Sequence, residues 1–265
     1  MIDLSEKARA LVATPKGVLA ADESNATADK RLTAYGIETG PEMRRKYREL
    51  YLSAPGVEQF LSGVILYSET LEQKADSGES FAASLHARGI MPGIKVDEGI
   101  EPMPESEDES ITKGLLGLSD RLHGYRDAHQ TGFTKWRAVI KIDGDRLPTS
   151  AAIVENARCV QEAGMVPILE PEVLYDGMHS RMRSRAVITD ALHALVQALG
   201  EHGVDQSAVI IKTSMAMSGK GTGKIDTPEE VAEDTLGALT EAVPAVIPGI
   251  VFLSGGQGND QATDN

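Results

Sequence analysis

Three lysines each lie at the end of an apolar run that has the composition of a buried strand. Lys95 lies in Gly-Ile-Lys-Val-Asp, Lys141 in Ala-Val-Ile-Lys-Ile and Lys212 in Val-Ile-Ile-Lys-Thr. A cation in such a place is unfavourable unless it is paired with an acid, loses its proton or takes part in chemistry. We therefore expect these amines to line one site for an anionic substrate, where one of them acts as a nucleophile.

Carboxylates lie at the ends of two further apolar runs. Asp22 follows Leu-Ala-Ala, and Glu170 and Glu172 follow Pro-Ile-Leu. Crowding among cations and partial burial lower the pKa of a lysine, so that a neutral amine becomes accessible near neutral pH. Such an amine forms an imine with a ketone, and the protonated imine accepts the electrons of a breaking C–C bond. The carboxylates could move the protons that these steps require.

The direction of the lysine side chains follows from strand parity. Residues two apart share a face of a strand, so Val139 lies on the face of Lys141 and Ile210 on the face of Lys212. One face of a barrel strand is the interior, and we expect both lysines to point inward at the mouth. The alternative is that these lysines form buried ion pairs only.

The elements that must position these residues are apolar, β-rich runs. The runs are Gly17–Ala21, Gly63–Tyr67, Gly93–Val96, Arg137–Ile142, Met165–Leu169, Ala208–Lys212 and Gly249–Leu253. Their spacing is too long for hairpins and fits strand–helix–strand crossovers. Helix signals fill the gaps, such as the capping box Thr-Pro-Glu-Glu at 227–230. Continuously apolar strands, each followed by a helix, indicate a parallel sheet covered by helices. The acidic stretch Glu101–Ser110 is predicted to be a solvated loop.

Two α/β architectures fit this alternation, the barrel and the doubly wound sheet. Polar residues lie at the carboxyl ends of several strands, where barrel enzymes place their catalytic groups, whereas an open sheet concentrates them at one switch point. We therefore predict a TIM (β/α)8-type barrel that forms a single domain over residues 1–265. Only seven strands are found, so we expect the eighth to be missing, the domain to be C-terminally incomplete, and a gap to separate the first and seventh strands.

The composition excludes several classes of function. The chain has 40 acidic and 26 basic residues and a formal charge of -14, which argues against nucleic acid but not against a phosphorylated small molecule. One cysteine, Cys159, excludes a disulfide framework, and the six histidines have no ligand spacing. We therefore expect no metal and no cofactor. The chain has no apolar signal core and no run of the ~20 apolar residues that span a bilayer, so we predict a cytoplasmic protein without a membrane partner.

Several stretches together resemble class I (Schiff-base) fructose-1,6-bisphosphate aldolase. The stretches are Gly17–Ser24, Gly63–Leu71, Gln73–Asp76, Gly93–Asp97, Lys135–Ile142, Pro167–Glu172 and Phe252–Gln257. They occur in the family's order, so the resemblance covers essentially the whole chain. Two departures stand out: Thr213-Ser214-Met215 replaces the Pro-Asn-Met of animal members, and the family's eighth strand, with a Ser and an Arg of the C1-phosphate clamp, is not found.

The resemblance implies roles for the residues that could do chemistry. Lys212 would form the Schiff base, and Glu170 would be the principal proton-transfer residue, with Glu172 as a further catalytic carboxylate. Asp22 would handle the proton of the C4 hydroxyl, and Lys141 would hold developing negative charge.

The resemblance also implies a substrate-binding set. Lys95 would bind polar groups of the substrate, and Ser254, Gly255 and Gly256 would form part of the C1-phosphate site. Arg31 and Arg44 match positions for the other phosphate, and Ser24 is a further substrate-binding candidate.

The activity implied by the resemblance is metal-independent and reversible. Fructose 1,6-bisphosphate would be split into dihydroxyacetone phosphate and glyceraldehyde 3-phosphate through an imine on Lys212, in a homo-oligomer. One alternative is a Schiff-base aldolase for another phosphorylated sugar. The other is a truncated, inactive chain that acts only as a subunit or interaction partner, because the phosphate clamp would be half-built.

Overall fold

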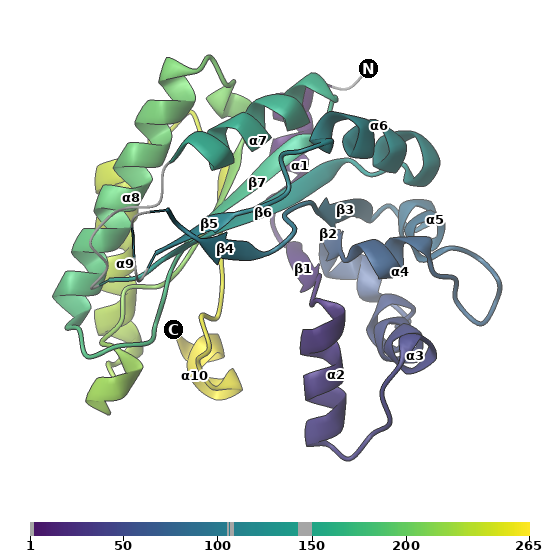
Figure 1. The fold of residues 1–265 in the computed structure, drawn as a ribbon, viewed down its shortest axis with the longest axis horizontal. Coiled ribbons are helices and arrows are strands. Elements are labelled where there is room, and N and C mark those ends of the chain that lie inside the picture. Colours follow the sequence, from purple (N-terminus) through teal and green to yellow (C-terminus); the bar gives the residue numbers. More distant parts are fainter. Residues whose placement is uncertain (1–2, 105, 107–108, 143–149) are drawn as a thin grey trace.

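Among the residues that the structure describes, the main sheet contains seven parallel strands in the order β1-β2-β3-β6-β7-β8-β9. The computed structural model describes residues 3–104, 106, 109–142 and 150–265. The strands of the main sheet are β1 (Gly17–Ala21), β2 (Leu61–Leu66), β3 (Met91–Lys95), β6 (Phe133–Ile140), β7 (Val166–Val173), β8 (Ile210–Thr213) and β9 (Gly249–Phe252). The sheet curves strongly and its outer face is covered by helices (Figure 1), as the parallel α/β pattern predicted.

Helices connect the strands, because every parallel step needs a crossover. They are α1 (Leu4–Leu11), α2 (Asn25–Ala34), α3 (Pro41–Leu52), α4 (Ser68–Glu72), α5 (Phe81–Ala87), α6 (Leu118–His129), α7 (Ser150–Glu162), α8 (Arg181–Glu201), α9 (Pro228–Ala242) and α10 (Asn259–Asp264). Short 3-10 turns lie at η1 (Val57–Gln59), η2 (Gln206–Ala208) and η3 (Lys220–Thr222). The predicted capping box is confirmed at α9: Thr227 Oγ1 accepts from Glu230 N (3.3 Å), and Glu230 Oε2 accepts from Thr227 N (3.1 Å).

The inward face of the sheet begins with an apolar layer at the amino ends of the strands. Phe133, Val166, Ile168 and Ile210 pack there against Leu11 of α1, which closes this end. A Cβ on Gly93 would overlap the Phe133 ring, so that position has room only for glycine. The inward face therefore has a solid floor, and residues further along the same faces must form the site.

The outward face packs on the helices. Trp136 is fully buried there, in a core with Ala157 and Val160 of α7. Trp136 lies inside β6, which begins at Phe133, four residues before the predicted start. The strand β7 likewise continues to Val173, so the carboxylates at 170 and 172 lie within a strand rather than after one.

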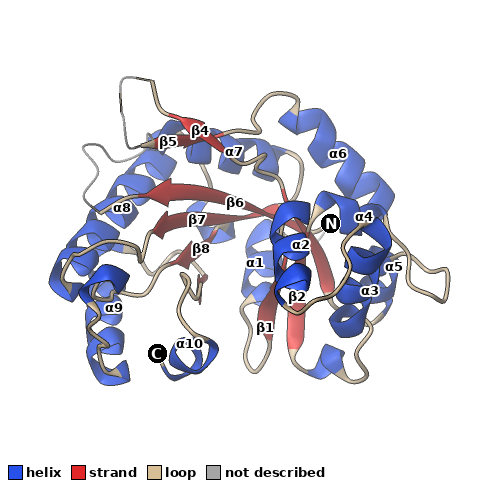
Figure 2. Cartoon of the chain, turned by 60° about the horizontal axis from the view of Figure 1, so that its bottom comes forward, coloured by secondary structure: helices blue, strands red, loops and turns tan. Residues whose placement is uncertain are grey.

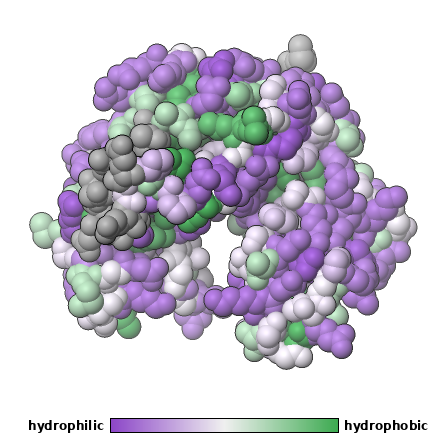
Figure 3. All heavy atoms as spheres, viewed as in Figure 1, coloured by the Kyte–Doolittle hydropathy of each residue, from purple (hydrophilic) through white to green (hydrophobic). Residues whose placement is uncertain are grey.

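The described sheet ends at β1 on one side and at β9 on the other, with no ladder between these two strands. Figure 2 shows the separation of β1 from the strands that lead to α10, and Figure 3 shows a hollow at the lower centre of the molecule. The expectation of seven parallel strands with a gap is confirmed for the described residues.

The acidic stretch after β3 is not a plain loop. Strands β4 (Ile100–Pro102) and β5 (Ser110–Thr112) pair there as an antiparallel hairpin, and Thr112 Oγ1 donates to Arg137 O (2.7 Å). The loop prediction is therefore wrong for the two ends of the stretch, which pair with each other through the backbone, and its residues 105, 107 and 108 lie outside the described part of the chain. Within the described part of the chain, no helix is long and apolar enough to cross a membrane.

Candidate active site

Four charged side chains meet above the apolar floor of the sheet. Lys135 Nζ lies 2.7 Å from Asp22 Oδ2 and 3.1 Å from Glu170 Oε2. Lys212 Nζ lies 2.9 Å from Glu170 Oε1. The exposed fractions of these side chains lie between 4% and 11%. Two amines and two carboxylates thus form one buried, charge-balanced cluster, the lysine–carboxylate cluster.

Strand parity brings the members of this cluster together. Lys135 follows the floor residue Phe133 by two positions on β6, and Glu170 follows Ile168 by two on β7. Lys212 has the same relation to Ile210 on β8, and Asp22 comes directly after β1. Each charged group therefore lies one layer above an apolar one, at the carboxyl-end side of the barrel.

The charges of the cluster stabilise one another. Burial acts to raise the pKa of the Asp22 carboxyl, but the charges of Lys135 and Lys212 outweigh burial and hold that pKa below its usual value. Burial acts to lower the pKa of Lys135, but the charges of Asp22, Glu170 and Asp97 outweigh burial and raise that pKa above its usual value. Asp22 therefore stays ionised and Lys135 stays protonated across the neutral range.

The two lysines of the cluster have different surroundings. Lys135 contacts two carboxylates, whereas Lys212 contacts one. The Glu170 oxygen facing Lys135, Oε2, lies at ion-pair distance but has no hydrogen-bond partner among the described residues. A buried carboxylate with one oxygen against each amine is suited to exchange protons with a group bound between them. Lys212 is therefore the less constrained of the two amines.

Two further ion pairs flank the cluster. Lys95 Nζ, at the end of β3, donates to Asp97 Oδ1 (2.5 Å) and to Asp97 O (2.8 Å). Arg137 Nε donates to Glu172 Oε2, and Arg137 N donates to Asp97 Oδ2 (3.3 Å). Arg137 and Glu172 lie on the inward faces of β6 and β7, one step further out than Lys135 and Glu170. The inward surface thus carries alternating charges toward the mouth.

The structure changes the choice of lysine on β6. The predicted residue, Lys141, follows the last residue of this strand and is exposed, so it is not part of the cluster. Lys135 takes that place and was missed. Both lysines have the inward parity, and Lys135 was passed over because the strand was expected to begin at Arg137. The alternation Phe133-Lys135-Arg137 was the available signal.

The predicted phosphate ligands on α2 and α3 have different environments. Arg31, in the last turn of α2, is 57% exposed and pairs with Glu23 (2.7 Å). Ser24 is the N-cap of α2, where its Oγ accepts from Thr27 N (3.3 Å).

Arg44 is buried, and unlike the exposed Arg31 its guanidinium does not face solvent. It donates to Asp29 (2.8 Å) and to Glu69 (2.6 Å), so two carboxylates already neutralise its guanidinium. We therefore do not retain Arg44 as a phosphate ligand.

The loop after β9 is a backbone-rich concavity beside β8. Leu253 N donates to Thr213 O (3.1 Å), which fixes the loop next to the strand of Lys212. Gly255 and Gly256 have φ angles of 61° and 87°, a left-handed conformation that favours glycine. Successive backbone N–H groups in such a turn can bind an anion, so Ser254, Gly255 and Gly256 remain candidates for phosphate binding.

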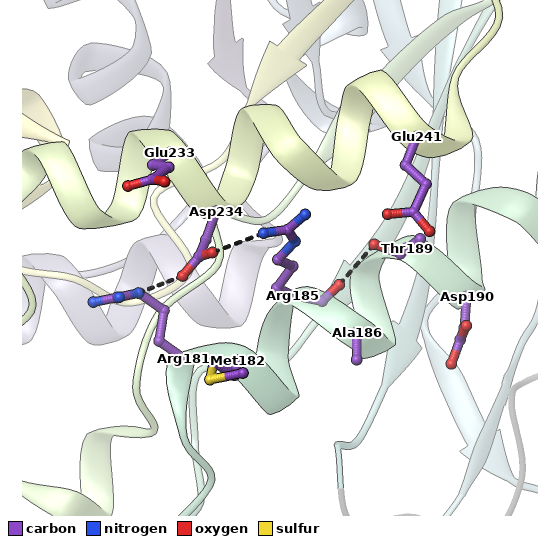
Figure 4. A pocket seen from close by; sticks show the side chains of 9 residues that line it. All are labelled: Arg181, Met182, Arg185, Ala186, Thr189, Asp190, Glu233, Asp234 and Glu241. Carbon is purple, nitrogen blue, oxygen red and sulfur yellow. Dashed lines mark hydrogen bonds and ion pairs between the residues drawn. The ribbon is translucent and has the colours of Figure 1, made fainter.

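A second hollow lies away from this cluster. A groove of about 510 Å³ between α8 and α9 is lined by Arg181, Arg185 and Asp234, among others (Figure 4). Asp234 pairs with Arg181 (2.5 Å) and with Arg185 (3.1 Å), so these three charges are paired within the groove. Among the described residues no group of three or more His, Cys, Asp or Glu could hold a metal ion. The lysine–carboxylate cluster is therefore the candidate active site.

Known proteins with this sequence pattern are aldolases. Residues 3–265 match the family model described as fructose-bisphosphate aldolase class-I. The chain is 45% identical over 267 residues to the probable fructose-bisphosphate aldolase class 1 of Xanthomonas campestris pv. campestris, covering 98% of this chain and 79% of that protein. It is 44% identical over 271 residues to fructose-bisphosphate aldolase of Drosophila melanogaster, covering 99% of this chain and 74% of that protein.

A solved structure agrees in fold as well as in sequence. Fructose-bisphosphate aldolase from Plasmodium falciparum, in complex with TRAP and a small-molecule inhibitor, superposes with a TM-score of 0.95 at 37% identity. The match covers 98% of this chain and 77% of that chain. By sequence, by fold and by a lysine–carboxylate cluster suited to imine chemistry, the chain belongs to the class I fructose-bisphosphate aldolase family.

Proposed function

We propose that this protein reversibly cleaves fructose 1,6-bisphosphate into dihydroxyacetone phosphate and glyceraldehyde 3-phosphate through an imine on Lys212. The observation that carries the proposal is the buried carboxylate of Glu170, which has Lys212 Nζ at 2.9 Å on one oxygen and Lys135 Nζ at 3.1 Å on the other. A substrate atom bound between the two lysines would thereby lie near the nucleophilic amine of Lys212, the cation of Lys135 and the carboxylate of Glu170, which can exchange protons with it.

Imine formation uses Lys212, Glu170 and Lys135. Glu170 accepts a proton from the Lys212 ammonium, and the free amine attacks the C2 ketone while the protonated Lys135 stabilises the negative charge that develops on the C2 oxygen. Glu170 passes this proton, and then a second one from the Lys212 nitrogen, to that oxygen, which leaves as water; the imine keeps one N–H and carries the positive charge. The role that the sequence assigned to Lys141 is thus proposed for Lys135.

Carbon–carbon cleavage uses Asp22. Its carboxylate accepts the proton of the C4 hydroxyl while the C3–C4 bond breaks, and the imine takes up the electron pair as an enamine. Glyceraldehyde 3-phosphate leaves, the enamine is protonated at C3, and water hydrolyses the imine to release dihydroxyacetone phosphate. Lys135 supports this step as well, because its charge keeps the pKa of Asp22 low and the carboxylate ready to accept.

Substrate binding uses the groups around the cluster. Lys95 would turn from Asp97 toward substrate hydroxyls, and the loop of Ser254, Gly255 and Gly256 would bind the C1 phosphate. Ser24, the N-cap of α2, and Arg31, in the last turn of that helix, would bind the C6 phosphate. One candidate phosphate site follows β1 and the other follows β9, the two edge strands of the sheet, and two such sites favour a ketose bisphosphate over a monophosphate.

We further propose that the protein acts in the cytosol as a homo-oligomer. A relative with 44% identity over 264 residues is named fructose-bisphosphate aldolase 6, cytosolic, from Arabidopsis thaliana. Sedimentation analysis of the protein tests the oligomer, and a monomer would overturn it.

Borohydride trapping tests the nucleophile. With dihydroxyacetone phosphate and borohydride we expect one covalent adduct, which peptide mapping places on Lys212, and no adduct with Lys212→Ala. Lys141→Ala is the matched control, because this exposed lysine lies outside the cluster, and it should trap as well as the unsubstituted protein. An adduct on Lys135 or Lys95 would overturn the assignment.

A further inference from the structure

Arg48 of α3 is a charged side chain that the reaction as described does not use. It is 1% exposed, among the most buried side chains of the protein. Its Nη2 donates to Glu23 O (2.5 Å), and its Nη1 lies 3.3 Å from Glu23 Oε2. Tyr51 Oη accepts from Nη1 (3.0 Å), and Thr70 Oγ1 accepts from Nε (3.3 Å). Glu23 is the carboxylate that neutralises this buried guanidinium.

Glu23 directly follows the catalytic candidate Asp22 and contacts two arginines. Its Oε1 pairs with Arg31 Nη2 (2.7 Å), while Oε2 accepts from Arg48 and from Tyr47 Oη (3.2 Å). One negative charge therefore lies between two positive ones. Arg48 is almost fully buried and cannot turn to solvent, whereas Arg31 is 57% exposed and can.

We propose that Arg48 is a positioning residue that keeps Arg31 available for the C6 phosphate, an inference that rests on the proposed function. Because Arg48 partly neutralises the carboxylate of Glu23, this carboxylate neutralises Arg31 only in part. Arg31 can therefore leave Glu23 and bind a phosphate dianion when the substrate enters. Without Arg48, Glu23 would neutralise Arg31 alone and compete with the phosphate for it.

A purely structural role predicts something different. A buried ion pair adds little stability compared with well-packed apolar side chains, so stability alone gives little reason for a guanidinium at this position. A structural role would also affect all substrates alike. The proposal instead predicts an effect only on ligands that carry the C6 phosphate, which fructose 1-phosphate lacks.

The experiment compares fructose 1,6-bisphosphate with fructose 1-phosphate. Arg48→Met removes the charge and keeps a long apolar side chain. We expect its KM for the bisphosphate to rise about tenfold, the factor that corresponds to ~1.4 kcal/mol, with kcat changed less than threefold. Both constants for fructose 1-phosphate should stay within about twofold. Arg48→Lys keeps the buried charge and should restore most of the bisphosphate KM.

Three controls separate the outcomes. Arg45→Met removes a neighbouring arginine of α3 whose partners are Glu42, Glu49 and Asp76, and it should leave the substrate ratio unchanged. Arg31→Met combined with Arg48→Met should be no worse for the bisphosphate than Arg31→Met alone, because both act on one contact. If Arg48→Met does not fold, Arg48→Gln, which keeps a donor to Glu23 O, takes its place with the same expected KM.

The result that overturns the proposal is an equal loss on both substrates, or additive effects of Arg31 and Arg48. Inert binding ligands make the readout independent of imine chemistry. The polyol hexitol 1,6-bisphosphate should lose about tenfold in affinity on Arg48→Met, and hexitol 1-phosphate should not. Borohydride trapping on Lys212 reports the proposed function separately, so failure of trapping and failure of the phosphate discrimination are distinguishable.

Discussion

Replacing Lys135 by methionine should unbalance the charge of the lysine–carboxylate cluster. The unsubstituted cluster has two amines and two carboxylates. In Lys135→Met, Glu170 keeps Lys212 at 2.9 Å, but Asp22 loses the contact at 2.7 Å. Removing one partner of a buried ion pair costs about 3–5 kcal/mol, because the other charge is left buried. We therefore expect the free energy of unfolding to fall by about this amount at pH 8.

The loss should depend on pH in a defined direction. In the unsubstituted protein the pKa of Asp22 is held low, so its contribution to stability is present above the unfolded value of ~3.9 and is lost only below it. In the variant, burial without Lys135 raises the pKa of Asp22 above the unfolded value. The folded variant then binds a proton more readily than the unfolded chain as the pH falls. The stability difference between the two proteins should therefore be smaller at pH 5 than at pH 8.

Urea unfolding at both pH values measures this difference. Lys141→Met is the control for an exposed lysine, and its effect should stay within about 0.5 kcal/mol. The double variant Lys135→Met/Asp22→Asn removes both charges of one pair and should recover most of the lost stability. An equal loss for Lys135→Met and Lys141→Met, or no recovery in the double variant, would refute the charge-balance reasoning. Turnover of Lys135→Met should also fall by roughly 10²–10³-fold, the loss typical of one removed oxyanion donor.

Two further predictions test the proton transfer and the floor of the barrel. Glu170→Gln keeps the shape of the carboxylate but not its acid–base function, so kcat should fall by roughly 10²–10⁴-fold with little change in KM; a near-normal kcat would assign the proton transfer to Glu172. Gly93→Ala places a methyl group in the Phe133 ring and should lower the free energy of unfolding by about 1–3 kcal/mol. Gly17→Ala, with nothing within 4 Å of the added carbon, is its control, and equal effects in thermal unfolding would contradict the overlap.

Much of the fold could be predicted because its signals are local. Each strand is a continuous apolar run, and each helix has its own start signal, such as the Thr227 capping box that the structure contains. Parity, which is also local, placed Lys212 on an inward face. The bounds of β6 were less accurate, because Lys135 interrupts its hydrophobic pattern with an inward-facing charge. The hydrophobic pattern of a strand is least regular at the positions where the strand contributes charged side chains to the active site.

The sequence by itself determined the alternation of strands and helices, the inward parity, and the presence of amines and carboxylates at the strand ends. Only the tertiary structure decided which lysine of β6 joins the cluster. Lys135 and Lys141 have equal parity, but depth along the barrel depends on how β6 lies against β3 and β7, where Lys135 pairs in register with Lys95 and Ile168.

The tertiary structure also determines which arginine has a charge that is available to bind phosphate. Arg44 and Arg31 are both arginines near the start of the chain, and the sequence does not distinguish them as phosphate ligands. Packing gives Arg44 two carboxylates, whereas Arg31 shares the single carboxylate of Glu23 with Arg48. Whether a cation can bind a ligand depends on how many counter-charges the fold brings to it, and those counter-charges come from other elements of the chain.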